Sequence, residues 1–281
     1  MMTNLDVVTG LWNWHSPAWA VTFIAAGFYF LLAWRRHASL KNIAFFAACA
    51  AAFLIALASP VATLASRYLF SAHMSQHLLL LLIVPLCGML AWPSSREVEA
   101  SGRWRRHRQG SAPIGWAAGV GAMWFWHIPA LCTASMRSPL VLDIQIISLI
   151  AAGAAFWWPV FSPITECRTP PHLAAMYLFA GCLGCSLLGI YITFSPVSVC
   201  PLYSEPIAVC SLYSDPTGST DLLRLIHEQW GFTHRVDQQV GGLLMWVPAC
   251  MIYLGAILTK ISSWYHVSEP SQSASTSLAA E

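Results

Sequence analysis

The stretch SAHMSQHLLLLLIVPLCGML, Ser71 to Leu90, combines two features that decide the kind of fold this chain adopts. Most of it is apolar, and its length matches the roughly 20 residues that a membrane-spanning helix needs. Near its start, His73 and His77 lie four residues apart, so in a helix their imidazoles share one face. Ionisable side chains inside a membrane are costly and usually face a bundle interior or a cavity. The stretch therefore predicts a transmembrane helix with a functional pair of histidines near one end.

The rest of the sequence is equally apolar. Of its 281 residues, 57% are hydrophobic and 9% are charged, whereas a soluble domain carries about 25% charged residues. Backbone polar groups in lipid need partners within the chain, so long apolar runs form helices. We therefore expect an all-α, polytopic membrane protein with seven transmembrane helices, at about 17–34, 43–60, 69–92, 114–131, 140–161, 173–194 and 240–259.

The distribution of positive charge predicts the orientation. Cytoplasmic loops of membrane proteins carry an excess of Lys and Arg. If the N-terminus is outside, ten of the 14 Lys and Arg residues fall on inward segments, so we expect the N-terminus outside and the C-terminus in the cytoplasm. No basic region precedes the first apolar run, which argues against a cleavable signal peptide. The inward residues are Arg35, Arg36, Lys41, Arg96, Arg103, Arg105, Arg106, Arg108, Arg168 and Lys260.

We expect one domain, a seven-helix membrane domain over residues 1–265, with an outer loop at 195–236. The polar tail 266–281 has the composition of a disordered cytoplasmic segment. In the loop, VCPLYSEPIA (199–208) is followed by the similar VCSLYSDPTG (209–218), which we interpret as a duplicated turn.

The cysteines permit several interpretations. The duplicated turn is either a neutral insertion or a segment in which Cys200 and Cys210 form a reversible disulfide or bind a soft metal. Cys182 and Cys185 form a C-x-x-C pattern whose interleaved glycines favour helix packing over metal or redox chemistry. A free cysteine in an apolar span usually behaves as a small hydrophobic residue. We expect this of Cys49, Cys87, Cys132, Cys182, Cys185 and Cys250.

The predicted topology brings further polar side chains to the depth of the first histidine pair. The third span runs inward, so His73, Met74 and His77 lie in its outer third. The fourth span runs outward and ends with MWFWHIPAL, which places His127 at the same level, with Met123 one turn before it.

The seventh span enters from outside with Asp237, and Met245 follows two turns later on the same face. Imidazole together with thioether favours copper, because methionine is a soft ligand suited to Cu(I). Alternatively, the methionines only fill gaps in the bundle, and Asp237 orients a histidine or pairs with an arginine. The candidate metal-binding residues are His73, Met74, His77, His127, Asp237, Met245 and Met123.

Other functions use the same histidines differently. His77 and His127 could hold a haem from opposite faces, the histidines could relay protons, or the protein could be a metal-free docking factor. The sequence contains no nucleophile elbow, phosphate loop, paired catalytic carboxylates or nucleic-acid motif. We therefore expect no enzyme, no catalytic residues and no nucleic-acid partner.

Four motifs resemble one known family. HMSQHLLLLLIVPL, MWFWHIPAL, FWWPV and DQQVGGLLMWVP, in this order, resemble the CtaG family of cytochrome c oxidase assembly factors, multi-pass proteins of the bacterial plasma membrane. The resemblance implies a chaperone that supports copper supply to the respiratory chain, with haem-copper oxidase subunits and a copper donor protein as partners. The polar positions that match are His73, Met74, His77, His127, Asp237, Gln238 and Met245. Many members carry further histidines early in the fifth span, where this chain has Asp143 and Gln145.

Overall fold

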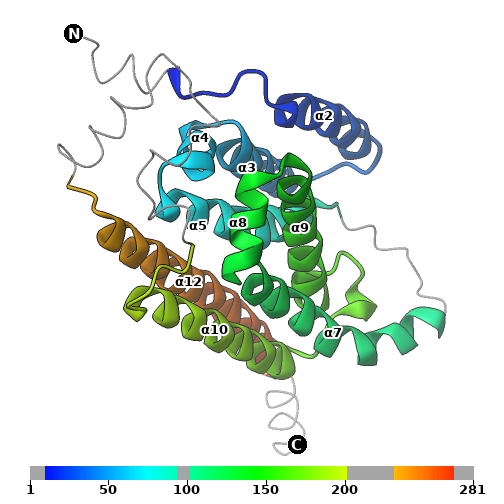
Figure 1. Ribbon diagram of the computed structural model, residues 1–281. Coiled ribbons are helices and arrows are strands. Elements are labelled where there is room, and N and C mark those ends of the chain that lie inside the picture. Colours follow the sequence, from blue (N-terminus) through cyan, green and yellow to red (C-terminus); the bar gives the residue numbers. More distant parts are fainter. Residues whose placement is uncertain (1–9, 94–101, 201–230, 269–281) are drawn as a thin grey trace, which may run out of the picture.

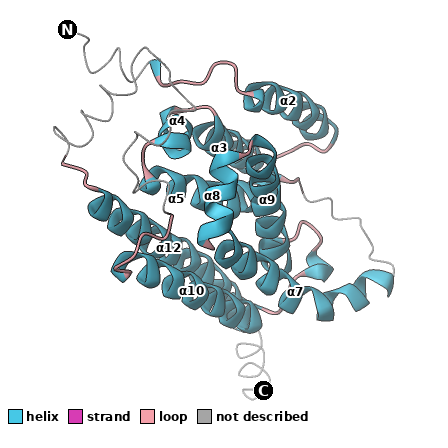
Figure 2. Ribbon diagram, in the orientation of Figure 1, coloured by secondary structure: helices cyan, strands magenta, loops and turns pink. Residues whose placement is uncertain are grey.

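The computed structural model describes residues 10–93, 102–200 and 231–268 (Figure 1). These residues form helices joined by loops, without a strand among them (Figure 2). The predicted all-α class is thereby confirmed for this part of the chain. Most of the duplicated turn, including Cys210, and most of the predicted tail lie outside the described residues.

Several helices begin with a proline as their first residue. Its fixed φ angle suits a helix, and its missing N–H would have no partner in the first turn. Ser16 and Ser59 precede two of these prolines, and their hydroxyl groups cap the helices. The helices are α2 (Pro17–Arg35), α3 (Leu40–Leu57), α4 (Pro60–Arg67), α5 (Phe70–Leu78), α6 (Val84–Ala91), α7 (Gly102–Trp126), α8 (Pro129–Arg137), α9 (Pro139–Phe161), α10 (Pro171–Phe194) and α12 (His234–Ser268).

Six helical segments of the described chain are long and apolar enough to cross a membrane. They correspond to all the predicted spans except the fourth, at 114–131, which the structure divides between α7 and α8. The division has a local cause, because a residue before proline avoids the helical conformation. Ile128, before Pro129, is extended.

The last helix begins earlier than the sequence predicts. The expected outer loop reached residue 236, but α12 starts at His234. Thr233 accounts for this start, because its hydroxyl accepts a hydrogen bond from Val236 N (3.3 Å) and its carbonyl accepts one from Asp237 N (2.9 Å). Asp237 therefore lies in the first turn of a long helix.

The quoted stretch forms a single helical rod with an irregular middle. Between α5 and α6, residues Leu79–Ile83 form a π-helical turn, in which Val84 N–H donates to the carbonyl of Leu79, five residues back. Pro85 has no N–H, so it cannot donate the usual helical hydrogen bond to the carbonyl of Leu81, four residues before it. That carbonyl lies against Gly153 of α9, at a position where a Cβ atom would collide with it.

Figure 1 shows α10 and α12 side by side and antiparallel, and these two helices share the most extensive contact in the bundle. Helix α5 packs on α12, while α9 packs on α6 and α7. An aromatic core lies between α9 and α12. In it Trp157 stacks on Tyr253 at a centroid distance of 5.8 Å, and Phe156 meets Tyr253 edge-on. Helix α2 is peripheral and packs on α3.

The contact at Gly153 is testable. Gly153→Ala places a methyl group against the Leu81 carbonyl and 2.8 Å from Pro85 Cγ. We expect this overpacking to cost about 1–3 kcal/mol and to lower the melting temperature of the detergent-purified protein. Gly121→Ala is the matched control, because nothing lies within 4 Å of its added Cβ. Equal melting temperatures for the two variants would contradict the close approach of α9 to the π turn.

Candidate functional site

The N-terminal end of the quoted helix is held by a carboxylate from the last helix. The first N–H groups of a helix have no partner within it, and no side chain of α5 itself caps this one. Instead Phe70 N and Ser71 N donate to the carboxylate of Asp237, at 2.6 and 3.0 Å. Asp237 is buried. It therefore fixes α12 against the start of α5 and complements the positive end of the helix dipole.

Gly241, one turn after Asp237, lets α5 and α12 approach closely. A Cβ atom there would lie 2.7 Å from the Phe70 ring and 3.1 Å from Met74 Cγ. The contact between the two helices thus brings α12 directly onto the helix face that carries Met74.

Three histidines lie together beside the contact between α5 and α12. His73 and His77 of α5 have ring centroids 4.4 Å apart, and His127 meets His77 edge-on at 5.2 Å. All three are buried, with His73 only 1% and His77 only 2% exposed. The structure thus brings together His73, His77 and His127, which the sequence analysis placed at one depth.

His127 lies just beyond the end of α7, and its contacts fix its tautomer. Its Nδ1 is 2.5 Å from the carbonyl oxygen of Met123. Because a carbonyl only accepts, Nδ1 carries the proton and Nε2 presents a lone pair. That lone pair faces the sulfur of Met74 at 3.1 Å. Two acceptors thus face each other, with no proton to share between them.

The His77 ring is buried without a hydrogen-bond partner among the described residues. Both of its ring nitrogens are buried, and neither has a hydrogen-bond partner within the described chain. A neutral imidazole has one donor and one acceptor, and leaving such groups buried without partners costs about 1–3 kcal/mol each. The ring of His77 is therefore available to a ligand.

The remaining candidate residues are Met123, Met245 and Asp237. Met123 and Met245 are buried in the same apolar cluster as Met74. Both oxygens of Asp237 accept the hydrogen bonds from α5, so this carboxylate already has a structural role. Across 10–93, 102–200 and 231–268, no three His, Cys, Asp or Glu side chains are arranged to hold a metal ion. The metal-binding role of the seven candidate residues stays a prediction.

Two buried glutamines also lie within the bundle, and neither was among the candidate residues. Gln76, between the two histidines of α5, donates through Nε2 to the Ala56 carbonyl at the end of α3 (2.9 Å). Gln145 is also buried, and its Nε2 has no partner among the residues that the structure describes. A polar residue within an apolar run was the available signal for both.

A disulfide joins Cys132 of α8 to Cys200, after α10. The expectation that Cys132 is a free, small hydrophobic residue is therefore wrong, because the fold brings it to a cysteine 68 residues away. Gln238 holds the same segment: its Oε1 accepts from Val199 N (3.2 Å), and its Nε2 donates to the Ile192 carbonyl (3.1 Å). The disulfide uses Cys200, one of the two cysteines for which we considered a Cys200–Cys210 bond.

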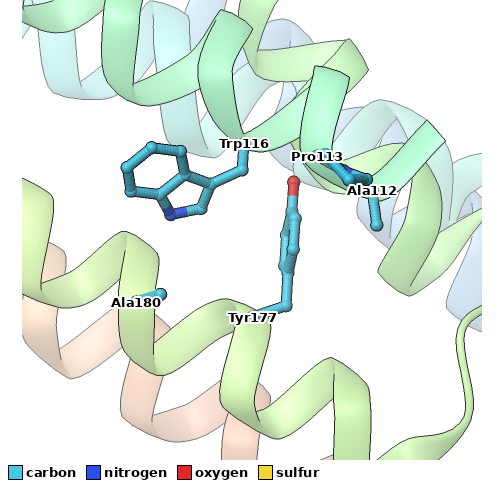
Figure 3. Close-up of a pocket in the computed structure, with 5 residues that line it drawn as sticks. All are labelled: Ala112, Pro113, Trp116, Tyr177 and Ala180. Carbon is cyan, nitrogen blue, oxygen red and sulfur yellow. The ribbon is translucent and has the colours of Figure 1, made fainter. Parts of the chain in front are cut away.

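A separate groove lies between α7 and α10 (Figure 3). Its volume is about 320 Å³, and its lining is apolar apart from the Trp116 indole and the Tyr177 hydroxyl. Tyr177 donates that hydroxyl to the Phe156 carbonyl at 2.8 Å. The groove presents no metal-binding side chain, so the histidine cluster is the better candidate site. The groove is lined by Ala112, Pro113, Trp116, Tyr177 and Ala180.

The capping role of Asp237 predicts a loss of stability. Asp237→Ala leaves two buried N–H groups without partners, at a cost of about 2–4 kcal/mol, and should lower the melting temperature of metal-free protein. Asp143→Ala removes an exposed carboxylate and should change it little. If Asp237→Ala melts like the Asp143 control, the cap does not stabilise α5.

The disulfide gives a second prediction. Cys132→Ala/Cys200→Ala releases a long loop, and we expect a loss of about 2–4 kcal/mol, visible as a lower melting temperature. Reductant should lower the wild-type value towards that of the variant and leave the variant unchanged. The control, Cys49→Ala/Cys87→Ala, removes two free cysteines and should keep its response to reductant. A wild-type protein indifferent to reductant would contradict the bond.

A known protein family matches the part of the chain that contains these residues. A family model described as cytochrome c oxidase caa3 assembly factor matches residues 26–266. No curated protein and no solved structure matches the chain. The family match includes all the residues of the candidate site and confirms the resemblance seen in the four motifs. The chain belongs to the Caa3_CtaG family of cytochrome c oxidase assembly factors.

Proposed function

We propose that this assembly factor binds copper at the histidine cluster and passes it to an oxidase subunit. The observation that carries the proposal is His77, whose two ring nitrogens are both buried and both without a hydrogen-bond partner among the described residues. A cation bound to one nitrogen would offset part of that cost. The rings of His73 and His127 lie next to that of His77.

The pair formed by His127 and Met74 supports copper in particular. The lone pair of His127 Nε2 and the Met74 sulfur are 3.1 Å apart. Two ligands of one ion, with metal–nitrogen and metal–sulfur bonds of about 2.0 and about 2.3 Å at a tetrahedral angle, would be about 3.5 Å apart, so a small movement of the Met74 side chain would let both atoms bind one ion. Thioether with imidazole is a soft ligand set that favours Cu(I) over harder ions.

The proposed topology places the cluster near the outer surface. We propose seven spans, with α7 as the fourth, the N-terminus outside and the C-terminus in the cytoplasm of a bacterium. Helix α7 has 25 residues, which is about 37 Å at 1.5 Å per residue. The Cys132–Cys200 bond begins five residues after His127, and disulfides persist in oxidising compartments outside the cytoplasm. A membrane with an oxidising outer side and the cytoplasm on its inner side is the plasma membrane, which we therefore propose as the location of the protein.

On this proposal the protein is a chaperone for a metal ion and has no catalytic turnover. Histidine and methionine ligands bind copper without the permanent charge that thiolates would bring, which suits an ion that must leave again. The partners are a haem-copper oxidase subunit, which receives the ion, and a copper donor protein, which supplies it.

The test is Cu(I) stoichiometry of detergent-purified protein under reducing conditions. We expect His77→Leu, which keeps the volume of the side chain, and His73→Ala/His77→Ala each to lose about one equivalent relative to wild type. His172→Ala is the control, because its ring meets Trp264 at the other end of the bundle and its loss should leave the stoichiometry unchanged.

The visible spectrum of the same samples separates the alternatives. Undiminished copper in both histidine variants would refute the proposal. A Soret band in wild type that disappears in His77→Leu would instead assign the cluster to haem. Neither copper nor haem in wild type would leave docking or proton transfer as its function.

A further inference from the structure

A second cluster of soft donor atoms lies between α10 and α12. The sulfurs of Cys182 and Cys250 are 3.0 Å apart, although these residues are 68 positions apart in the chain. The C-x-x-C pattern itself does not form a pair, because Cys185 meets the Tyr253 hydroxyl at 3.4 Å instead. The two thiols that meet therefore belong to different helices.

The close approach of the two helices explains this contact. A Cβ atom on Gly189 would lie 2.9 Å from the Gly242 carbonyl oxygen and 2.7 Å from Trp246 Cβ. Small residues at such a crossing let transmembrane helices approach closely. Cys182 lies about two turns before Gly189 on α10, and Cys250 lies about two turns after Gly242 on α12. Because the helices are antiparallel, both positions lie on the same side of the crossing.

Ser186 completes a short chain of hydrogen bonds. Its hydroxyl donates to the Cys182 carbonyl at 2.8 Å, so its oxygen accepts from the Cys250 thiol at 3.2 Å. Cys250 sulfur in turn accepts from the Cys182 thiol. Both cysteines are free and half-buried, so the pair lies at the edge of the helix interface within reach of an ion.

We propose that Cys182 and Cys250 form a second site, which binds a soft monovalent ion, Cu(I). Thiolate sulfur selects Cu(I) over harder ions. Two sulfurs that bind one ion linearly, at about 2.3 Å each, are about 4.6 Å apart, so the two side chains must rotate apart from their present 3.0 Å when the ion enters. On binding, one or both S–H protons leave and a Cu–S bond forms to each sulfur, without any change of oxidation state. The Ser186 hydroxyl can turn from the Cys182 carbonyl to donate to a sulfur that has lost its proton.

The thiol site is independent of the histidine cluster. Met245 and Cys250 both lie on α12, but five residues separate them, which turns their side chains about 140° apart around the helix. Met245 is fully buried towards the bundle, whereas Cys250 is half-buried. Loss of one site should therefore leave the other intact.

The experiment counts Cu(I) on purified, reduced protein in four variants. Wild type should bind about two equivalents; Cys182→Ser/Cys250→Ser should bind about one, and so should His73→Ala/His77→Ala. The combined quadruple variant should bind none. Cys185→Ser, the control from the same C-x-x-C pattern, should bind as wild type does. Near-ultraviolet thiolate-to-copper absorption should disappear only in variants that lack the cysteine pair.

The outcomes for the two sites are distinguishable. An unchanged copper count and unchanged near-ultraviolet absorption in Cys182→Ser/Cys250→Ser would overturn the thiol site and leave the histidine proposal standing. The same variant losing copper while His73→Ala/His77→Ala loses none would support the thiol site alone. Equal numbers of free thiols in unreduced wild type and in Cys182→Ser/Cys250→Ser, with no Cu(I) bound by the reduced pair, would replace the metal site by a disulfide.

Discussion

One constraint organises the structure: a polar group placed in lipid needs a partner inside the protein, because no water is available there. Asp237 meets this constraint for the first turn of α5 and Gln76 for the Ala56 carbonyl of α3. Gln238 does so for the end of α10 and the segment after it. These side chains tie α12 to α5, α5 to α3 and α12 to α10, so the same bonds that satisfy the backbone also fix the bundle.

Against this background, unsatisfied atoms carry information. His77 retains two buried nitrogens without partners, and His127 turns a lone pair towards the sulfur of Met74. The π turn at Leu79–Ile83 begins two residues after His77, and such irregular turns occur frequently at functional sites. A frame made by satisfied polar groups thus surrounds the small region in which we propose that the metal binds.

The two donor clusters differ in chemistry and in position. The histidine cluster is enclosed by α5, α7 and α12, with neutral nitrogen and thioether donors. The thiol pair lies at the edge of the α10–α12 contact and can become anionic. In a family that serves oxidase assembly, the proposed pair of sites would bind one kind of ion with different affinity and different access.

The sequence by itself determined the helical class, most of the apolar segments and the family, because these follow from composition, spacing and motifs. Only the tertiary structure decided that His127 lies beside His77, that Asp237 caps α5, and that Cys132 bonds to Cys200. It also paired Cys182 with Cys250 instead of Cys185. The physical reason is that periodicity reports which face of a helix is apolar, whereas contacts between helices depend on close approaches, such as the one at Gly189, that no local pattern encodes.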